Sequence, residues 1–227
     1  MRDGYAVGFC GRDAELGAAI EADHPGTLFV GADVGDEPDV RRFVTTCAER
    51  LGPPTVLVNN AGRNANFDAT TMTVAEWDAF FAVDLKSAWL CAKHVLPHMR
   101  ANGGGAIVNV SSIHAAATLE GFFPYAAAKA GLAGLTRSLA LDHGPDTIRV
   151  NCLCPGFTDT RLVRESMDRS SDPAAAERAM VAGVALGRIA SADEIAATIA
   201  FLASDEASYV TGATLYVDGG LTARRAG

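Results

Sequence analysis

The order of its apolar segments most constrains the fold of this chain. Short apolar runs, typical of buried strands, cover residues 5–10, 27–32, 55–59, 106–111, 148–153 and 214–217. Segments with helical spacing lie between them, at 14–22, 38–51, 73–99, 124–142 and 191–202. Strands that are apolar along their whole length are buried on both faces, as in parallel sheets covered by helices. The sequence therefore predicts an α/β fold with a doubly wound parallel sheet and helices on both faces.

Composition limits the kind of protein this can be. With 227 residues, of which 49% are hydrophobic and 20% charged, the chain suits a single globular domain with a large core. A net charge of −8 disfavours nucleic acid and anionic membranes as partners. The chain has neither an apolar run of about 18–20 residues nor a signal peptide, so we expect a cytoplasmic protein without membrane association.

No metal site is predicted from the cysteines and histidines. The five cysteines are odd in number and lack the spacing of a small disulfide scaffold. Cys152 and Cys154 share one strand face, but no second ligand pair with suitable spacing accompanies them. His94 and His98 share a helix face without an adjacent acidic base, which is typical of ordinary helix-end residues.

The chemistry of the chain centres on a serine, a tyrosine and a lysine. Tyr125 and Lys129 are four residues apart in an alanine-rich helical segment, so their side chains lie about 5–6 Å apart on one face. At an effective dielectric near 20, the ammonium favours tyrosinate by roughly 3 kcal/mol, or about two pKa units. The phenol can then exchange a proton with a substrate oxygen that Ser112, at a strand end, also holds. A packed ring beside a solvated amine is the alternative interpretation.

Further motifs stand in the same order as in a known family. They are Asn59-Asn60-Ala61-Gly62, Ser112, Tyr125 with Lys129, Asn151, Pro155-Gly156 with Thr158, and Val217-Asp218-Gly219-Gly220. Together they resemble the short-chain dehydrogenase/reductase family over about residues 4–221. The resemblance implies a single Rossmann-like domain and an NAD(P)-dependent oxidoreductase that interconverts ketones and secondary alcohols. The 3-oxoacyl-thioester reductases and sugar dehydrogenases look most similar.

The resemblance also implies a set of cofactor contacts. Tyr125 and Lys129 are implied at the nicotinamide ribose, Asp33 and Val34 at the adenine. The remaining implied contacts lie beneath the dinucleotide or over its amide: Asn59, Ala61, Gly62, Pro155, Gly156 and Thr158. A plain turn at Asn59, and a helix N-cap or turn at Asp33, are the alternatives. His114, Phe122, Phe123 and segment 157–167 are the expected neighbours of the substrate.

Arg12 indicates which dinucleotide the chain prefers. It follows the first strand, where the family reads the adenosine ribose. An acidic residue there accepts hydrogen bonds from a free 2′-hydroxyl, whereas arginine suits a 2′-phosphate. The sequence therefore favours NADP(H) over NAD(H), unless Arg12 is a solvent-facing residue that opens a helix.

The chain departs from the family in two places. Asp84, in Val-Asp-Leu, stands where the family usually has asparagine, and it either pairs with Lys129 or accepts a hydrogen bond from a proton relay. The glycine-rich strand-turn-helix of ~30 residues is also missing, and no glycine-rich run between a strand and a helix replaces it. We expect an N-terminally truncated sheet, in which strands 5–10 and 27–32 either pair directly with strand 55–59 or detach from it.

Two functions of different classes follow. The first is an NADP(H)-dependent oxidoreductase with Ser112, Tyr125, Lys129 and Asp84 at its catalytic centre and a small carbonyl or alcohol substrate. The alternative is a non-catalytic binding or assembly subunit that has lost dinucleotide binding, unless the true start codon lies upstream. We also expect a homotetramer, because segment 76–99 carries several large apolar side chains: Trp77, Phe80, Phe81, Trp89 and Leu90.

Overall fold

Strands and helices alternate along the chain, as the sequence predicts. The computed structural model describes residues 4–63, 66–168 and 172–223. Its strands are β1 (Val7–Gly11), β2 (Thr27–Gly31), β3 (Val56–Asn59), β4 (Gly105–Val110), β5 (Ile148–Pro155) and β6 (Thr214–Val217). The α-helices are α1 (Ala14–Asp23), α2 (Glu37–Leu51), α3 (Val74–Phe81), α4 (Ser87–Ala101), α5 (Tyr125–His143), α6 (Arg161–Asp168), α7 (Pro173–Val181) and α8 (Ala192–Ala203). The predicted α/β fold is confirmed.

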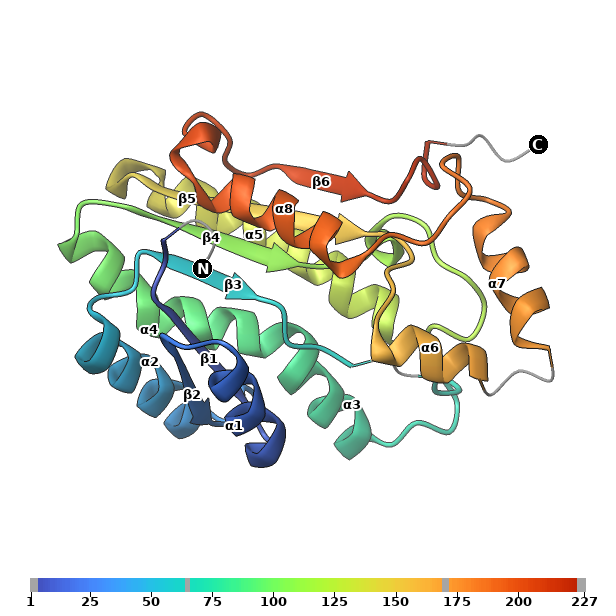
Figure 1. The fold of residues 1–227 in the computed structure, drawn as a ribbon, viewed down its shortest axis with the longest axis horizontal. Helices are drawn as coiled ribbons and strands as arrows, with labels where there is room; N and C mark the ends of the chain where they lie inside the picture. Colours follow the sequence, from blue (N-terminus) through green and yellow to red (C-terminus); the bar gives the residue numbers. More distant parts are fainter. Residues whose placement is uncertain (1–3, 64–65, 169–171, 224–227) are drawn as a thin grey trace.

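In the described residues the strands form two parallel sheets. β3, β4, β5 and β6 make a four-stranded sheet in that order, and β1 pairs with β2 in a separate sheet (Figure 1). Of the two arrangements expected for β1 and β2, the structure thus has the one in which they are not hydrogen-bonded to β3. The outer edge of β3 is left open, and Val58 there is 40% exposed.

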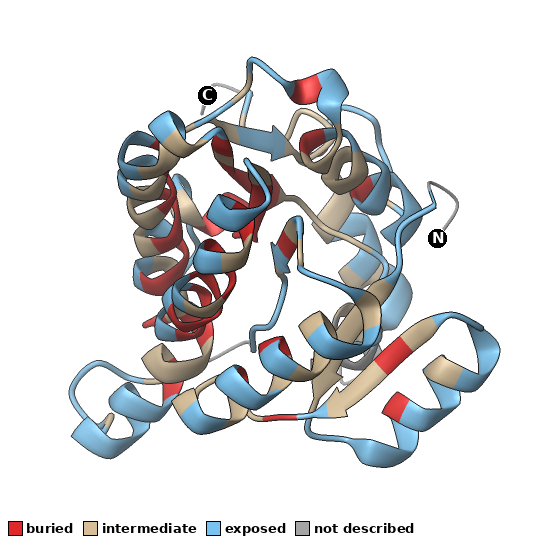
Figure 2. Ribbon diagram, turned by 90° about the vertical axis from the view of Figure 1, so that its left-hand side faces the viewer, coloured by how far each residue is buried: buried red, intermediate tan, exposed pale blue. Residues whose placement is uncertain are grey.

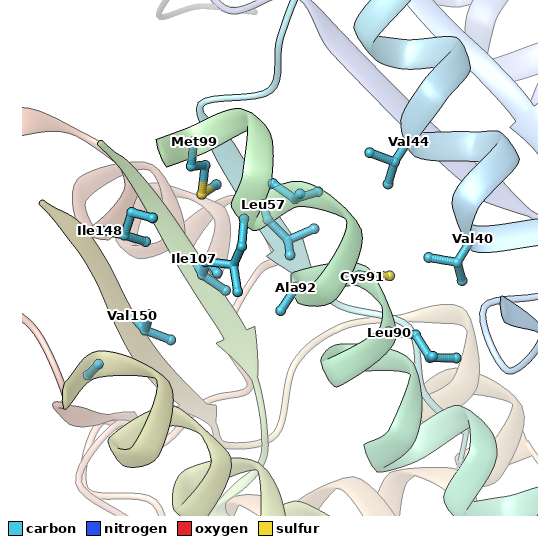
Figure 3. Packing of buried hydrophobic residues seen from close by; sticks show 13 residues of the cluster. Val40, Val44, Leu57, Leu90, Cys91, Ala92, Met99, Ile107, Ile148 and Val150 are labelled. Atoms are coloured by element: carbon cyan, nitrogen blue, oxygen red, sulfur yellow. The ribbon is translucent and has the colours of Figure 1, made fainter. Parts of the chain in front are cut away.

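Helices cover both faces of the four-stranded sheet. The largest buried cluster joins α2 and α4 to β3, β4 and β5, with Met99, Ile107 and Val150 fully buried in it (Figure 3). On the other face α8 packs Ile195 and Leu202 against the two central strands. Few residues of β1, β2 and α1 are buried (Figure 2). No helix in the described parts of the chain is long and apolar enough to cross a membrane.

The helix predicted over residues 73–99 is interrupted. It begins with a capping box between Thr73 and Glu76, but α3 ends at Phe81. One turn of π-helix, Ala82–Lys86, then precedes α4. An extra residue in a helical turn changes the direction in which the following side chains point, and such turns are frequent at functional sites. Asp84 lies in the middle of this turn and is 1% exposed.

Two glycine substitutions test how tightly the sheet packs. A Cβ on Gly105, at the start of β4, would lie 2.7 Å from Met99 Cγ and 2.8 Å from the carbonyl oxygen of Thr55. Overpacking of this kind typically costs 1–3 kcal/mol, so we expect Gly105→Ala to lower the free energy of unfolding by about 2 kcal/mol. Gly134 in α5 has nothing within 4 Å of an added Cβ. There the alanine should raise the free energy of unfolding by about 0.5–1 kcal/mol.

Urea unfolding followed by circular dichroism measures both variants against the wild type. If Gly105→Ala matched the wild type in midpoint and slope, β4 would not be as closely packed against α4 as the structure indicates.

Candidate active site

The candidate site lies at the carboxyl ends of three neighbouring strands. Asn59 ends β3, Ser112 follows β4 by two residues, and Pro155 ends β5. Because β3, β4 and β5 are parallel and adjacent, these three ends meet at one edge of the sheet. α5 begins at Tyr125 and packs against β5, which brings Tyr125 and Lys129 to the same edge.

Ser112 and Tyr125 point toward each other. The Ser112 side chain acts on the phenol and lowers its pKa, and Ser112 is 8% exposed. The Ser112 hydroxyl also accepts a hydrogen bond from the backbone N–H of His114 at 3.3 Å. The ring of His114 meets the Tyr125 ring edge to face at 5.5 Å and stacks on Phe122 at 4.1 Å. The serine and tyrosine hydroxyls are therefore close enough to bind one substrate oxygen between them.

Lys129 lies over the Tyr125 ring, as the four-residue spacing predicts. Its Nζ is 5.4 Å from the ring centroid, and the side chain is 5% exposed. The hydroxyl of Ser111 donates to the backbone carbonyl of Lys129 at 2.7 Å and so ties this turn of α5 to the end of β4. The tyrosine and the lysine thus share one helix face.

Asp84 pairs with Lys129, which is the first of the two arrangements expected for it. Asp84 Oδ1 is 3.6 Å from Lys129 Nζ and accepts the backbone N–H of Arg63 at 3.0 Å. The Arg63 guanidinium Nε is 4.0 Å from Oδ2. Gly62 makes room for this pair, because a Cβ there would lie 3.0 Å from both Asp84 Oδ1 and Lys129 Nζ.

The electrostatics of Tyr125 differ from expectation. Burial raises the pKa of Asp84 and lowers that of Lys129, and the opposite charge of each partner opposes the shift. Burial also raises the pKa of Tyr125, and the Asp84 charge adds to this, against the hydrogen bond from Ser112. The pKa of Tyr125 thus lies above its ordinary value in this structure and not below it, and the lowering effect of Lys129 stays a prediction. The ammonium is paired, and the phenol is largely withdrawn from water.

The residues expected at the adenine lie on the two-stranded sheet. Arg12 follows β1 and is exposed. Asp33 closes a local turn, since its side chain accepts the backbone N–H of Gly35 at 2.8 Å, which is the alternative noted for it. Val34 lies inside this turn.

The residues expected at the nicotinamide hold the strand ends together. Asn59 donates to Asn109 Oδ1 at 2.8 Å, so its side chain serves the sheet. A Cβ on Gly156 would lie 2.8 Å from the Cα of Asp218, which shows how closely the turn after β6 approaches. Thr158 donates to the Gly156 carbonyl at 3.2 Å.

The described residues fit one half of a dinucleotide better than the other. Ala61, Gly62 and Gly156 leave little side-chain bulk at the carboxyl edge, and Lys129 is a donor there for a ribose hydroxyl. For the pyrophosphate, no turn with three glycines joins a strand to the following helix within residues 4–63, 66–168 and 172–223.

Sequence reasoning missed two arginines beside these residues. Arg63 meets Asp84, and the Arg42 guanidinium donates to the Gly31 carbonyl at 2.6 Å and also pairs with Asp39. Arg42 thereby adds a second guanidinium at the carboxyl end of β2, near Arg12. In the sequence, Arg42 looks like a residue on the solvated face of a helix, and Arg63 follows a glycine in a loop. No local pattern therefore indicates either contact.

Comparison with known proteins agrees with this geometry. The family model described as "Enoyl-(Acyl carrier protein) reductase" matches residues 1–222. The chain is 44% identical to cis-4-hydroxycyclohexanecarboxylate dehydrogenase of Sinomonas cyclohexanicum, over 94% of this chain and 83% of that protein. It is 40% identical to a 3-oxoacyl-[acyl-carrier-protein] reductase of Pseudomonas aeruginosa, over 83% of this chain and 74% of that protein.

Solved structures give the same result. Levodione reductase superimposes with a TM-score of 0.90 at 32% identity, covering 98% of this chain and 90% of that one. A gluconate 5-dehydrogenase from Burkholderia cenocepacia in complex with NADP and tartrate gives 0.88 at 29% identity, covering 99% and 88%. With a parallel α/β fold and relatives that are dehydrogenases and reductases, the chain belongs to the short-chain dehydrogenase/reductase family.

Proposed function

We propose that this protein is an NADP(H)-dependent oxidoreductase that interconverts a ketone and a secondary alcohol, with Tyr125 as the general acid and base. One observation carries the proposal: Ser112 and the buried ammonium of Lys129 both lie beside the phenol of Tyr125. The dehydrogenases and reductases among its relatives support the same reaction class.

In this mechanism the nicotinamide cofactor supplies or accepts the hydride at the reacting carbon. Ser112 donates a hydrogen bond to the substrate oxygen and holds it beside the phenol. Tyr125 gives its proton to that oxygen in reduction and takes one from it in oxidation. Lys129 would bind the ribose of the nicotinamide, and its ammonium lies over the ring of Tyr125. The stacked rings of His114 and Phe122 form an apolar wall beside the reacting oxygen and exclude water from it.

Replacing Tyr125 by phenylalanine should abolish turnover and leave the fold intact. The proton donor is lost, and such groups typically contribute 10²–10⁴-fold to the rate. The assay is kcat with cis-4-hydroxycyclohexanecarboxylate, named for the 44% identical relative, as the first compound to try. Tyr209→Phe, at a fully exposed tyrosine, is the matched control and should leave kcat unchanged. A Tyr125→Phe variant with more than about a tenth of wild-type kcat would remove Tyr125 from this role.

NADPH should bind more tightly than NADH, and Arg12→Ala should erase most of the difference. A charge-assisted hydrogen bond to the 2′-phosphate contributes roughly 1.5–3 kcal/mol, or about 10- to 100-fold in Kd. Titration calorimetry of both cofactors measures it. Arg50→Ala, in the last turn of α2, is the control and should change neither constant. Equal dissociation constants in the wild type would exclude the preference.

The second candidate, a binding or assembly subunit without dinucleotide, is favoured by the separation of the two sheets. Two open strand edges support this, and so does Val58, an apolar residue 40% exposed on the β3 edge.

Under the second candidate, residues 1–227 should bind NADPH weakly. The described residues offer no glycine-rich turn between a strand and a helix to supply the backbone donors that pyrophosphate needs. Calorimetric titration with NADPH is the measurement. Micromolar binding by residues 1–227 would mean that another segment cradles the phosphates.

We also propose a homotetramer, on revised grounds. Phe80 and Leu90 are buried inside the chain and do not contribute to a subunit interface. Trp89, however, is 46% exposed on α4, and apolar side chains remain exposed at 36% or more around α8 and β6: Phe201, Tyr209, Leu215 and Tyr216. Light scattering at micromolar concentration should give a mass near four times 23.6 kDa. A monomeric mass would contradict the proposal.

The cytoplasm stays the predicted compartment.

A further inference from the structure

Asp84 is a buried carboxylate placed to act on Tyr125 through Lys129. It is 1% exposed, and its charged neighbours are Lys129 from α5, at 3.6 Å, and Arg63 from the loop after β3, at 4.0 Å. It also accepts the backbone N–H of Arg63 at 3.0 Å and 3.3 Å. These donors and cations favour the ionised carboxylate despite its burial.

The other groups that face Tyr125 carry less charge. His114 meets its ring, and burial lowers the pKa of that imidazole, so it is neutral at neutral pH. Cys154 of β5 also acts on Tyr125, and Cys152 and Cys154 both act on Lys129. Ser112 is uncharged. The strongest fields at the phenol therefore come from Lys129 and Asp84.

The Asp84–Lys129 pair affects the ionisation of Tyr125 differently from a single ammonium. A lone cation at this distance favours tyrosinate by roughly two pKa units at an effective dielectric near 20. A carboxylate 3.6 Å from the same nitrogen adds a charge of opposite sign that also acts on the phenol, so part of the field of the ammonium cancels. Burial of the ring then acts with little opposition.

We propose that Asp84 neutralises Lys129 and thereby keeps Tyr125 a phenol at neutral pH, so that the site is set for ketone reduction. This inference rests on the proposed function and gives it a direction. In reduction the carbonyl carbon gains a hydride from the reduced nicotinamide, and the oxygen takes the proton of Tyr125. The tyrosinate left behind regains a proton from solvent. Oxidation of the alcohol needs the tyrosinate at the start and becomes efficient in alkaline solution.

The first test needs neither cofactor nor turnover. Ultraviolet absorbance follows the ionisation of tyrosine with pH, and subtraction of the Tyr125→Phe titration isolates Tyr125 from the other three tyrosines. Asp84→Asn removes the charge and keeps an oxygen for the Arg63 N–H. The Tyr125 midpoint should fall by about one pH unit in that variant. Asp84→Glu keeps the charge and should titrate like the wild type. If Asp84→Asn fails to fold, Asp84→Ser provides the same neutralisation.

The second test uses initial rates in both directions in a form of the protein that turns over. In the pH–rate profiles of Asp84→Asn, the alkaline limb of reduction and the acid limb of oxidation should both move to lower pH by about one unit. The oxidation rate at neutral pH should rise by up to tenfold. Superimposable titrations of wild type and Asp84→Asn would overturn the inference. A shifted midpoint without turnover in any form of the protein would support the inference and count against the proposed function instead.

Discussion

The position of α5 against the sheet depends on a buried line of polar side chains. Asn59 donates to Asn109, and Asn109 donates to the hydroxyl of Thr136 at 2.9 Å, which in turn donates to the Leu132 carbonyl at 2.8 Å. Asn109 and Thr136 are fully buried, so a break would leave unpaired groups without water. The line joins β3, β4 and α5 in one register. The helix that carries Tyr125 and Lys129 is therefore fixed by the interior of the protein and not by its surface.

This scaffold determines where the charged groups of the site lie. α5 places Lys129 under the end of β4, and the π-turn between α3 and α4 places Asp84 opposite it. Breaking such a buried pair by removing one partner is costly, because the other charge is left without compensation. In the mechanism proposed above, the same pairing also keeps Tyr125 protonated, so the electrostatics of the reaction and the stability of the turn depend on one contact.

The sequence predicts the elements well and their interactions less well. Strand 214–217 and helix 191–202 agree with the structure, because apolar runs and local hydrogen bonds are encoded by near neighbours. The interruption after Phe81 could not be predicted, because it reflects how α3 and α4 pack and not the propensity of Ala82–Lys86. The raised pKa of Tyr125 likewise comes first from burial and then from the charge of Asp84, which is 41 positions away in the chain, and both act only after folding. The local spacing of Tyr125 and Lys129 therefore does not by itself give the pKa of the phenol.

The division into two sheets also shapes how the molecule fluctuates. β1 and β2 bond each other and reach the rest of the chain chiefly through α2, which packs on α4. Backbone hydrogen bonds in such an appendage open without breaking the four-stranded core, because few buried apolar contacts hold it in place. The molecule thus combines a core that unfolds as a whole with a smaller unit that opens on its own. Arg12 and Asp33 stand on the smaller unit, so the half of the site expected to read the adenine rests on the less cooperative part of the protein.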